Sequence, residues 1–138
     1  MLVPILTTTI VKNEFDLSGV ESLPRVDILY GHQETDPRII DFAASLEDVA
    51  GLVIASPNGG EGVTEAIARA AGLKPVVRHV RINVGMIAPS ASVPEGNSTI
   101  SAGLVNNQKS RILLQLALAT GADPRVVFES TLRSTLYE

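Results

Sequence analysis

Short apolar runs alternate with capped helix starts from Val26 onward, and this alternation most limits what the chain can fold into. The residues of Gly51–Ala55 form an unbroken apolar run, typical of a strand that is buried on both faces. The other predicted strands are 26–30, 75–80 and a short one at 99–102. Strands and helices in alternation predict an α/β fold of three layers, with a four-stranded, mostly parallel sheet between helices on both faces.

The predicted helices are defined mainly by their ends. Asp36-Pro37 and Asp123-Pro124 each combine an N-cap residue with proline at the first helical position. A third helix starts near Gly62 and is expected to close at Gly72. The last helix, from Asp123, is expected to run as far as Leu136, with Val126, Val127, Leu132 and Leu136 either in the core or on an exposed docking face.

The segment Asn106–Leu118, NNQKSRILLQLAL, predicts the remaining helix. The side chain of Asn106 is a good N-cap because it accepts from backbone N–H groups two or three residues on. One apolar face is expected at helical spacing, formed by Leu113, Leu116, Ala117 and Thr120.

Composition excludes several classes of function. The net charge is −4, and only 4% of the residues are aromatic, so nucleic acid is not an expected partner. No apolar run reaches the length of a membrane span, and the apolar start Met1–Leu6 lacks the basic region of a signal peptide. The chain contains no cysteine. A cytoplasmic location is favoured for the chain as given, with no membrane partner.

Six short motifs resemble, in order and spacing, the C-terminal domain of bacterial-type L-asparaginases and glutaminase-asparaginases. In the Asn106 helix, Asn106, Gln108, Lys109 and Arg111 keep the family's Asn-Pro-Gln-Lys-Ala-Arg run, whereas Asn107 and Ser110 depart from it. The other motifs are Phe15–Ser18 with Leu23–Val26, Gly51–Ala55, Val76–Arg78 with Arg81, Ala102-Gly103, and Asp123-Pro124. The resemblance covers about 120 residues, from near Phe15 to near Glu129.

The resemblance implies a Rossmann-like half domain at 25–138, preceded by an interdomain lead-in at 1–24. It also implies deamidation of L-asparagine, or of glutamine, to the acid and ammonia. The nucleophilic Thr of this reaction lies in the family's N-terminal domain, within Thr-Gly-Gly-Thr-Ile and Thr-Asp-Thr motifs that this sequence lacks. Thr7-Thr8-Thr9 is interpreted as part of the lead-in. We therefore expect a truncated family member that is inactive alone and has no catalytic residues of its own.

Substrate contacts are expected at the carboxyl edge of the sheet, where open α/β sheets bind ligands. This edge carries Gly31-His32, the 56–61 loop, the 81–98 loop and Gly103. In the family a neighbouring subunit contributes an Asn and a Glu from two such loops, which makes Asn58, Glu61 and Glu95 the candidates here. The competing interpretations of the 58–62 segment are a turn with positive φ and, less favoured, a phosphate cradle.

No metal or cofactor is expected. The two histidines are interpreted as structural, His32 in an exposed loop and His79 on a face of the sheet. The expected partners are a second copy of the chain or an asparaginase N-terminal domain, with a small amino acid as a possible ligand. Two alternatives stay open: a non-catalytic binding and assembly module, and a receiver-like signalling domain. The second is disfavoured because Tyr30-Gly31-His32 lacks an acidic pair.

Overall fold

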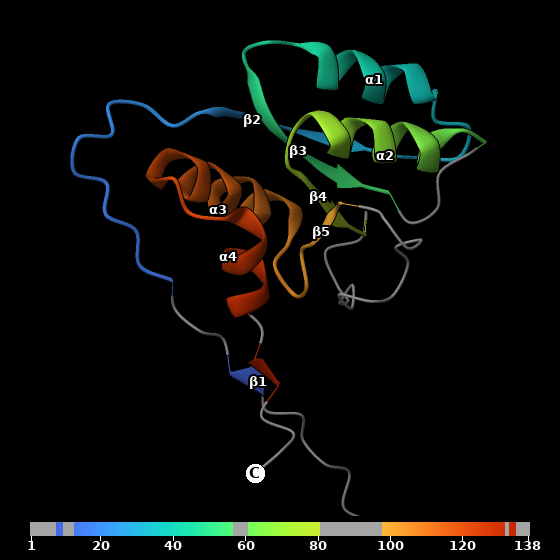
Figure 1. Ribbon diagram of the computed structural model, residues 1–138. Helices are drawn as coiled ribbons and strands as arrows, with labels where there is room; N and C mark the ends of the chain where they lie inside the picture. The colour runs from blue at the N-terminus through green and yellow to red at the C-terminus, as the bar shows by residue number, and fades with distance from the viewer. Residues whose placement is uncertain (1–7, 10–12, 57–60, 81–97, 132, 135–138) are drawn as a thin grey trace, which may run out of the picture.

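The computed structural model describes residues 8–9, 13–56, 61–80, 98–131 and 133–134 (Figure 1). Its centre is a four-stranded sheet in which every neighbouring pair is parallel, as the sequence predicted. The strands are, in spatial order, β2 (Arg25–Tyr30), β3 (Val49–Ala55), β4 (Val76–His79) and β5 (Ile100–Ser101). The spatial order equals the chain order, so β2 and β5 are the edge strands.

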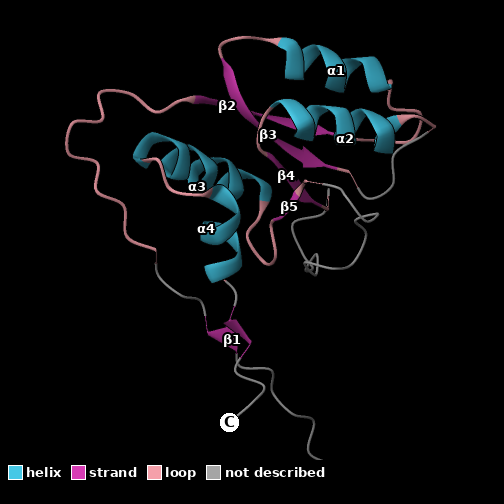
Figure 2. Cartoon of the chain, in the orientation of Figure 1, coloured by secondary structure: helices cyan, strands magenta, loops and turns pink. Residues whose placement is uncertain are grey.

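Four helices cover the two faces of the sheet and complete the predicted three layers (Figure 2). They are α1 (Pro37–Ser45), α2 (Val63–Leu73), α3 (Asn107–Thr120) and α4 (Pro124–Ser130). α1 and α2 lie on one face, while α3 and α4 lie on the other. Within the described residues, no helix has the length and apolar character needed to cross a bilayer.

Each face of the sheet contributes to a separate apolar core because successive strand side chains point to opposite faces. In β3, Leu52 and Ile54 pack with α1 and α2, whereas Val53 packs with α3. Gly51 also faces α3, and a Cβ added there would lie 2.9 Å from Leu114 Cδ2. The missing side chain therefore lets α3 lie close to the sheet.

The aspartate caps fold as predicted. The Asp36 carboxylate accepts from the Arg38 N–H at 2.9 Å, and Asp123 accepts from the Arg125 N–H at 2.8 Å. In both helices the intervening proline has no N–H of its own to satisfy.

Two predicted helix ends are wrong. α2 continues through Gly72 to Leu73, because Pro75 disfavours helical backbone at the residue before it, Lys74. α4 ends at Ser130 and does not reach Leu136. The hydroxyls of Ser130 and Thr131 donate back to the carbonyls of Val127 and Phe128, at 2.9 and 2.7 Å, and such bonds compete with helix continuation.

The chain beyond α4 forms a strand. β6 (Arg133–Ser134) pairs antiparallel with β1 (Thr8–Thr9), so part of the predicted lead-in carries regular structure. The pairing joins segments from opposite ends of the sequence (Figure 1). Leu132 and Leu136, predicted as helix residues, lie outside the described part of the chain.

Candidate functional site

The carboxyl ends of the parallel strands meet at one edge, as predicted. The ladder continues one residue beyond the strands, with Gly31 N donating to Ala55 O at 2.9 Å and Ser56 N donating to His79 O at 3.1 Å. On the far side of β4, Ala102 N donates to Arg78 O at 3.0 Å. These bonds fix the first residues of three connections relative to one another. The edge is therefore a hydrogen-bonded rim at which three connections begin.

Of the three predicted substrate contacts, only Glu61 is within the described structure. Its side chain is exposed, and it precedes Gly62, whose φ of +79° lies in the left-handed region. Gly62 is the N-cap of α2 and provides no side-chain cap. Glu61 thus directly precedes the N-cap, near the positive end of the helix dipole, where an anionic side chain is favoured. Asn58 and Glu95 lie outside the described residues, and so does the predicted 58–60 turn.

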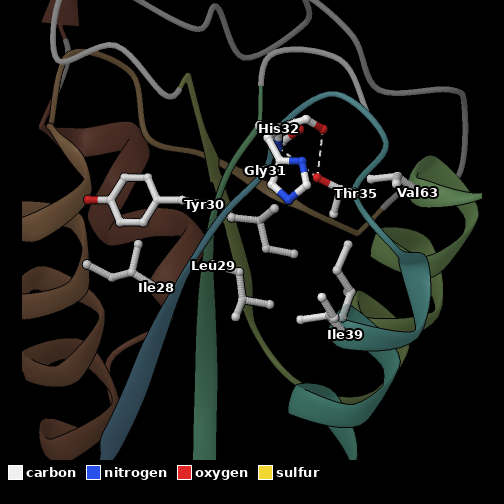
Figure 3. Close-up of a pocket in the computed structure, with 11 residues that line it drawn as sticks. Ile28, Leu29, Tyr30, Gly31, His32, Thr35, Ile39 and Val63 are labelled. Carbon is white, nitrogen blue, oxygen red and sulfur yellow. Dashed lines mark hydrogen bonds between the residues drawn. The ribbon is translucent and has the colours of Figure 1, made fainter. Parts of the chain in front are cut away.

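A cavity of about 140 Å³ opens at this edge, between β2 and β3 on one side and α1 and α2 on the other (Figure 3). The side chains of Leu29, Ile39 and Val63 face the cavity. Those of Ile28 and Tyr30 point from β2 towards α3 (Figure 3). The lining residues are Ile28, Leu29, Tyr30, Gly31, His32, Thr35, Ile39, Ile40, Ile54, Ser56 and Val63. Sequence reasoning did not find this cavity, because its walls come from four elements.

The polar groups at the top of the cavity differ in whether they have hydrogen-bond partners. The Thr35 hydroxyl accepts from the His32 N–H at 2.7 Å and donates to the His32 carbonyl at 2.7 Å (Figure 3). The Ser56 hydroxyl is buried and has no hydrogen-bond partner. An unpaired buried hydroxyl costs about 1–3 kcal/mol. Ser56 is thus the one polar side chain on the cavity wall that is both buried and unpaired among the described residues.

Gly31 is required by the close approach of β2 and β3 at this point. A Cβ added to Gly31 would lie 2.5 Å from Ser56 Cβ and 3.3 Å from Ser56 Cα. Real side chains do not approach so closely. Gly31 and Ser56 are therefore matched: the first has no side chain, and the second has a small one.

A second group of buried polar atoms lies on the α3 face. His79 and Asn107 are 1% and 0% exposed, and both donate to Val80 O, from Nδ1 at 2.7 Å and from Nδ2 at 3.3 Å. His79 Nε2 and Asn107 Oδ1 are unpaired. The prediction that His79 lies on a face of the sheet is confirmed. The burial of Asn107 was not predicted. The available signal was that Asn107 occupies a position at which the family motif has Pro.

The residues of the α3 run that follow the family pattern fix the helix in place. Asn106 Oδ1 caps α3 by accepting from the Lys109 N–H at 2.9 Å, as predicted. Gln108 Nε2 donates to Tyr30 Oη at 3.1 Å, and Arg111 Nε donates to the Val26 carbonyl at 2.8 Å. Both bonds reach β2, so the run ties α3 to the edge strand of the sheet.

The buried stripe of α3 shares only Ala117 with the predicted apolar face. It consists of Asn107, Ser110, Leu114, Gln115 and Ala117. Leu113 and Leu116 are only half-buried and line an open groove. Polar residues are stable in the stripe where they hydrogen-bond: Ser110 donates to Val105 O at 3.0 Å, and Gln115 donates to Pro24 O at 2.8 Å.

The remaining titratable groups near the edge do not form a metal centre. His32 is exposed, as predicted, and its Nδ1 lies 2.5 Å from the Gln33 carbonyl. Burial lowers the pKa of the half-buried Arg78 guanidinium. No three His, Asp or Glu side chains cluster for a metal ion within the ranges that the structure describes.

Comparison with known proteins gives a consistent result. The model of the glutaminase/asparaginase C-terminal domain matches residues 25–129. L-asparaginase 2 of Bacillus subtilis is 31% identical over 121 residues, which cover 83% of this chain and 31% of that protein. L-asparaginase 2 of Escherichia coli is 30% identical over 117 residues, covering 82% and 34%.

A solved structure agrees with these sequence relatives. The crystal structure of a probable cytoplasmic L-asparaginase from Campylobacter jejuni superposes with a TM-score of 0.70 at 29% identity. The match covers 86% of this chain and 37% of that one. The chain thus spans about a third of the length of the curated relatives it matches.

Proposed function

This chain belongs to the glutaminase/asparaginase family through its C-terminal domain, and from that premise we propose that it forms the C-terminal half of an L-asparagine amidohydrolase. The relatives are named as L-asparaginases. The observation that carries the proposal is the common edge of the sheet, where the residues after β2 and β3 lie in hydrogen-bonded register. An edge of this kind presents loops to a ligand held by another domain.

We propose further that these 138 residues give no turnover by themselves. The family resemblance assigns the nucleophile to Thr-Gly-Gly-Thr-Ile and Thr-Asp-Thr motifs, and neither occurs in the printed sequence. A hydroxyl attacks an amide only when a base within hydrogen-bond reach removes its proton. The chain then supplies a supporting wall of the active site and leaves the chemistry to a second domain.

In this proposal Glu61 adjusts substrate affinity. It takes the place at which the family resemblance puts a substrate-contacting Asn, and its exposed side chain lies beside the α2 N-terminus. An amide donates a hydrogen bond to the α-carboxylate of the substrate, whereas a carboxylate repels it. Asn58 and Glu95 remain candidates for the same wall on the resemblance alone.

A domain exchange tests the proposal. The segment of Bacillus subtilis L-asparaginase 2 that matches residues 25–129 is replaced by those residues, and ammonia release from L-asparagine is measured. We expect activity from the chimera and none from the 138-residue chain. A folded but inactive chimera contradicts the role as a C-terminal half. Ammonia release by the chain alone that is lost in Thr7→Ala or Thr8→Ala contradicts its dependence on a second domain.

The role of Glu61 is tested in the same chimera. Glu61→Asn is expected to lower KM for L-asparagine about fivefold, since removing a repulsion between like charges near 4 Å in water gains about 1 kcal/mol. Glu65→Asn is the matched control, because Glu65 is exposed in the first turn of the same helix. Equal KM values in both variants would remove Glu61 from the site.

A second candidate function is non-catalytic assembly, and the outer surface of α3 favours it. We call this surface the α3 groove; its volume is about 390 Å³, and it is lined by Val105, Gln108, Lys109, Ile112, Leu113 and Leu116. Ile112 is 44% exposed there. Exposed apolar surface of this kind mediates association with a second copy or with a family enzyme.

Light scattering of the purified chain tests assembly. If the α3 groove is the contact, Ile112→Glu shifts the chain towards monomer, while Val126→Glu leaves the mass unchanged. Val126 is the control because it is 60% exposed on α4 and does not line the groove. A chain that is monomeric at all concentrations, with or without a family enzyme, excludes this second function.

A further inference from the structure

The cavity between β2, β3, α1 and α2 has the composition of a small-ligand site. Apart from Gly31, His32, Thr35 and Ser56, the described residues whose side chains face the cavity are aliphatic, and the side chains of Ile28 and Tyr30 point away towards α3. Its volume of about 140 Å³ is close to the ~150 Å³ of an engineered apolar cavity that holds benzene. The space therefore suits a molecule of about six non-hydrogen atoms.

The polar group of such a ligand is specified by Ser56. The Ser56 side chain is 6% exposed, lines the cavity and is unpaired, so it has one O–H to donate and lone pairs to accept with. The Thr35 hydroxyl is already engaged on both sides by His32. A ligand oxygen at Ser56 would satisfy the buried hydroxyl that the protein itself leaves without a partner.

The walls also determine the charge of the ligand. Among the lining residues that the structure describes, there is no Lys, Arg, Asp or Glu. A carboxylate or ammonium group entering this space would lose its hydration without gaining a counter-charge, which is costly. An uncharged amide, ketone or alcohol has no such penalty.

From the cavity, its unpaired Ser56 hydroxyl and its uncharged walls, we infer that this domain binds a small neutral aliphatic molecule with one carbonyl or hydroxyl oxygen. The oxygen lies at Ser56, and the aliphatic part contacts Leu29, Ile39 and Val63, which face the cavity (Figure 3). The cavity lies on the opposite face of the sheet from α3, Glu61 is not among its lining residues, and the inference does not depend on the amidohydrolase assignment.

The test uses isobutyramide as the probe and isobutyrate as a charged molecule of the same size. Each is titrated into the ¹⁵N-labelled 138-residue chain, and amide shifts are followed by NMR. We expect saturable shifts at Leu29, Gly31 and Val63 with isobutyramide and none with isobutyrate. Absence of saturable shifts with isobutyramide, or equal affinity for both molecules, overturns the inference.

Three variants locate the bound probe. Ser56→Ala is expected to weaken isobutyramide binding about fivefold, the net worth of one neutral hydrogen bond. Ile39→Trp narrows the opening and is expected to abolish binding. Phe42→Trp is its control, because Phe42 is exposed on α1 without lining the cavity. Unchanged affinity in both Ser56→Ala and Ile39→Trp would overturn the assignment to this cavity.

Discussion

The close approach of Gly31 and Ser56 makes a sharp prediction about stability. In Gly31→Ala the new methyl group would overlap Ser56, because the distance to Ser56 Cβ would be only 2.5 Å. β2 and β3 are paired along the ladder up to Tyr30 and Ala55, and the last bond between them runs from Gly31 N to Ala55 O. The strands therefore cannot separate without losing bonds.

The expected cost follows from overpacking in a close-packed region. Such substitutions typically cost 1–3 kcal/mol, and we expect Gly31→Ala near the upper end, at about 3 kcal/mol of the free energy of unfolding. With Ser56→Gly in the background, the nearest remaining contact is Ser56 Cα at 3.3 Å, which small shifts accommodate. There the same substitution should cost less than about 1 kcal/mol, leaving a coupling energy of about 2 kcal/mol.

Urea unfolding of the four proteins in this cycle measures the coupling. Gly72→Ala serves as the control, because a Cβ at Gly72 in α2 meets nothing within 4 Å and should stabilise the helix by up to about 1 kcal/mol. The reasoning is refuted if Gly31→Ala costs the same with Ser or Gly at position 56. It is also refuted if Gly31→Ala costs no more than a typical surface substitution.

Three further predictions concern the helices. Leu114→Ala should lower the free energy of unfolding in urea by about 2–5 kcal/mol, and Leu113→Ala should lower it clearly less, because Leu114 is fully buried and Leu113 is not. The reverse order would favour the apolar face predicted from the sequence. Asn107→Pro should leave the free energy of unfolding unchanged or raise it by about 0.5–1 kcal/mol. The substitution puts proline at the first position of α3 and removes an unpaired buried oxygen. A markedly lower melting temperature would show that Asn107 is needed. The Arg38 guanidinium beside Asp36 lowers the pKa of the Asp36 carboxyl to about 2. The carboxylate therefore contributes stability that is fully present above its pKa in the unfolded chain and is lost as pH falls towards 2. In carboxyl ¹³C titration Arg38→Ala should raise the Asp36 midpoint, and an unchanged midpoint would exclude the ion pair as the main cause of the lowered pKa.

Local signals in the sequence were enough to define the layers of the fold. The apolar run at Gly51–Ala55 and the Asp-Pro helix starts depend on neighbours a few residues away, and both appear in the structure as predicted. The family resemblance could also be recognised from short motifs. In the α3 motif, Asn106 caps the helix, and Gln108 and Arg111 hydrogen-bond to β2, so these residues keep α3 in place.

Several features that the sequence did not specify depend on contacts between distant segments. The pairing of β6 with β1 joins residues from the two ends of the chain. Most of the buried stripe of α3 was missed because Asn107 and Ser110 are polar. Asn107 is satisfied in part by the distant Val80 carbonyl, and Ser110 by the Val105 carbonyl just before the helix.

The cavity shows this division most clearly. Gly31, Ile39, Ser56 and Val63 belong to four separate segments. The sequence predicted Gly31 and Ser56 at the same edge of the sheet, but it did not indicate that Ile39 and Val63 close a cavity there. The sequence by itself determined which segments become strands and helices, because periodicity and capping act over single turns and short runs. Only the packing of α1 and α2 on the sheet decided where a buried hydroxyl would lie without a partner, since cavities arise from the fit between elements.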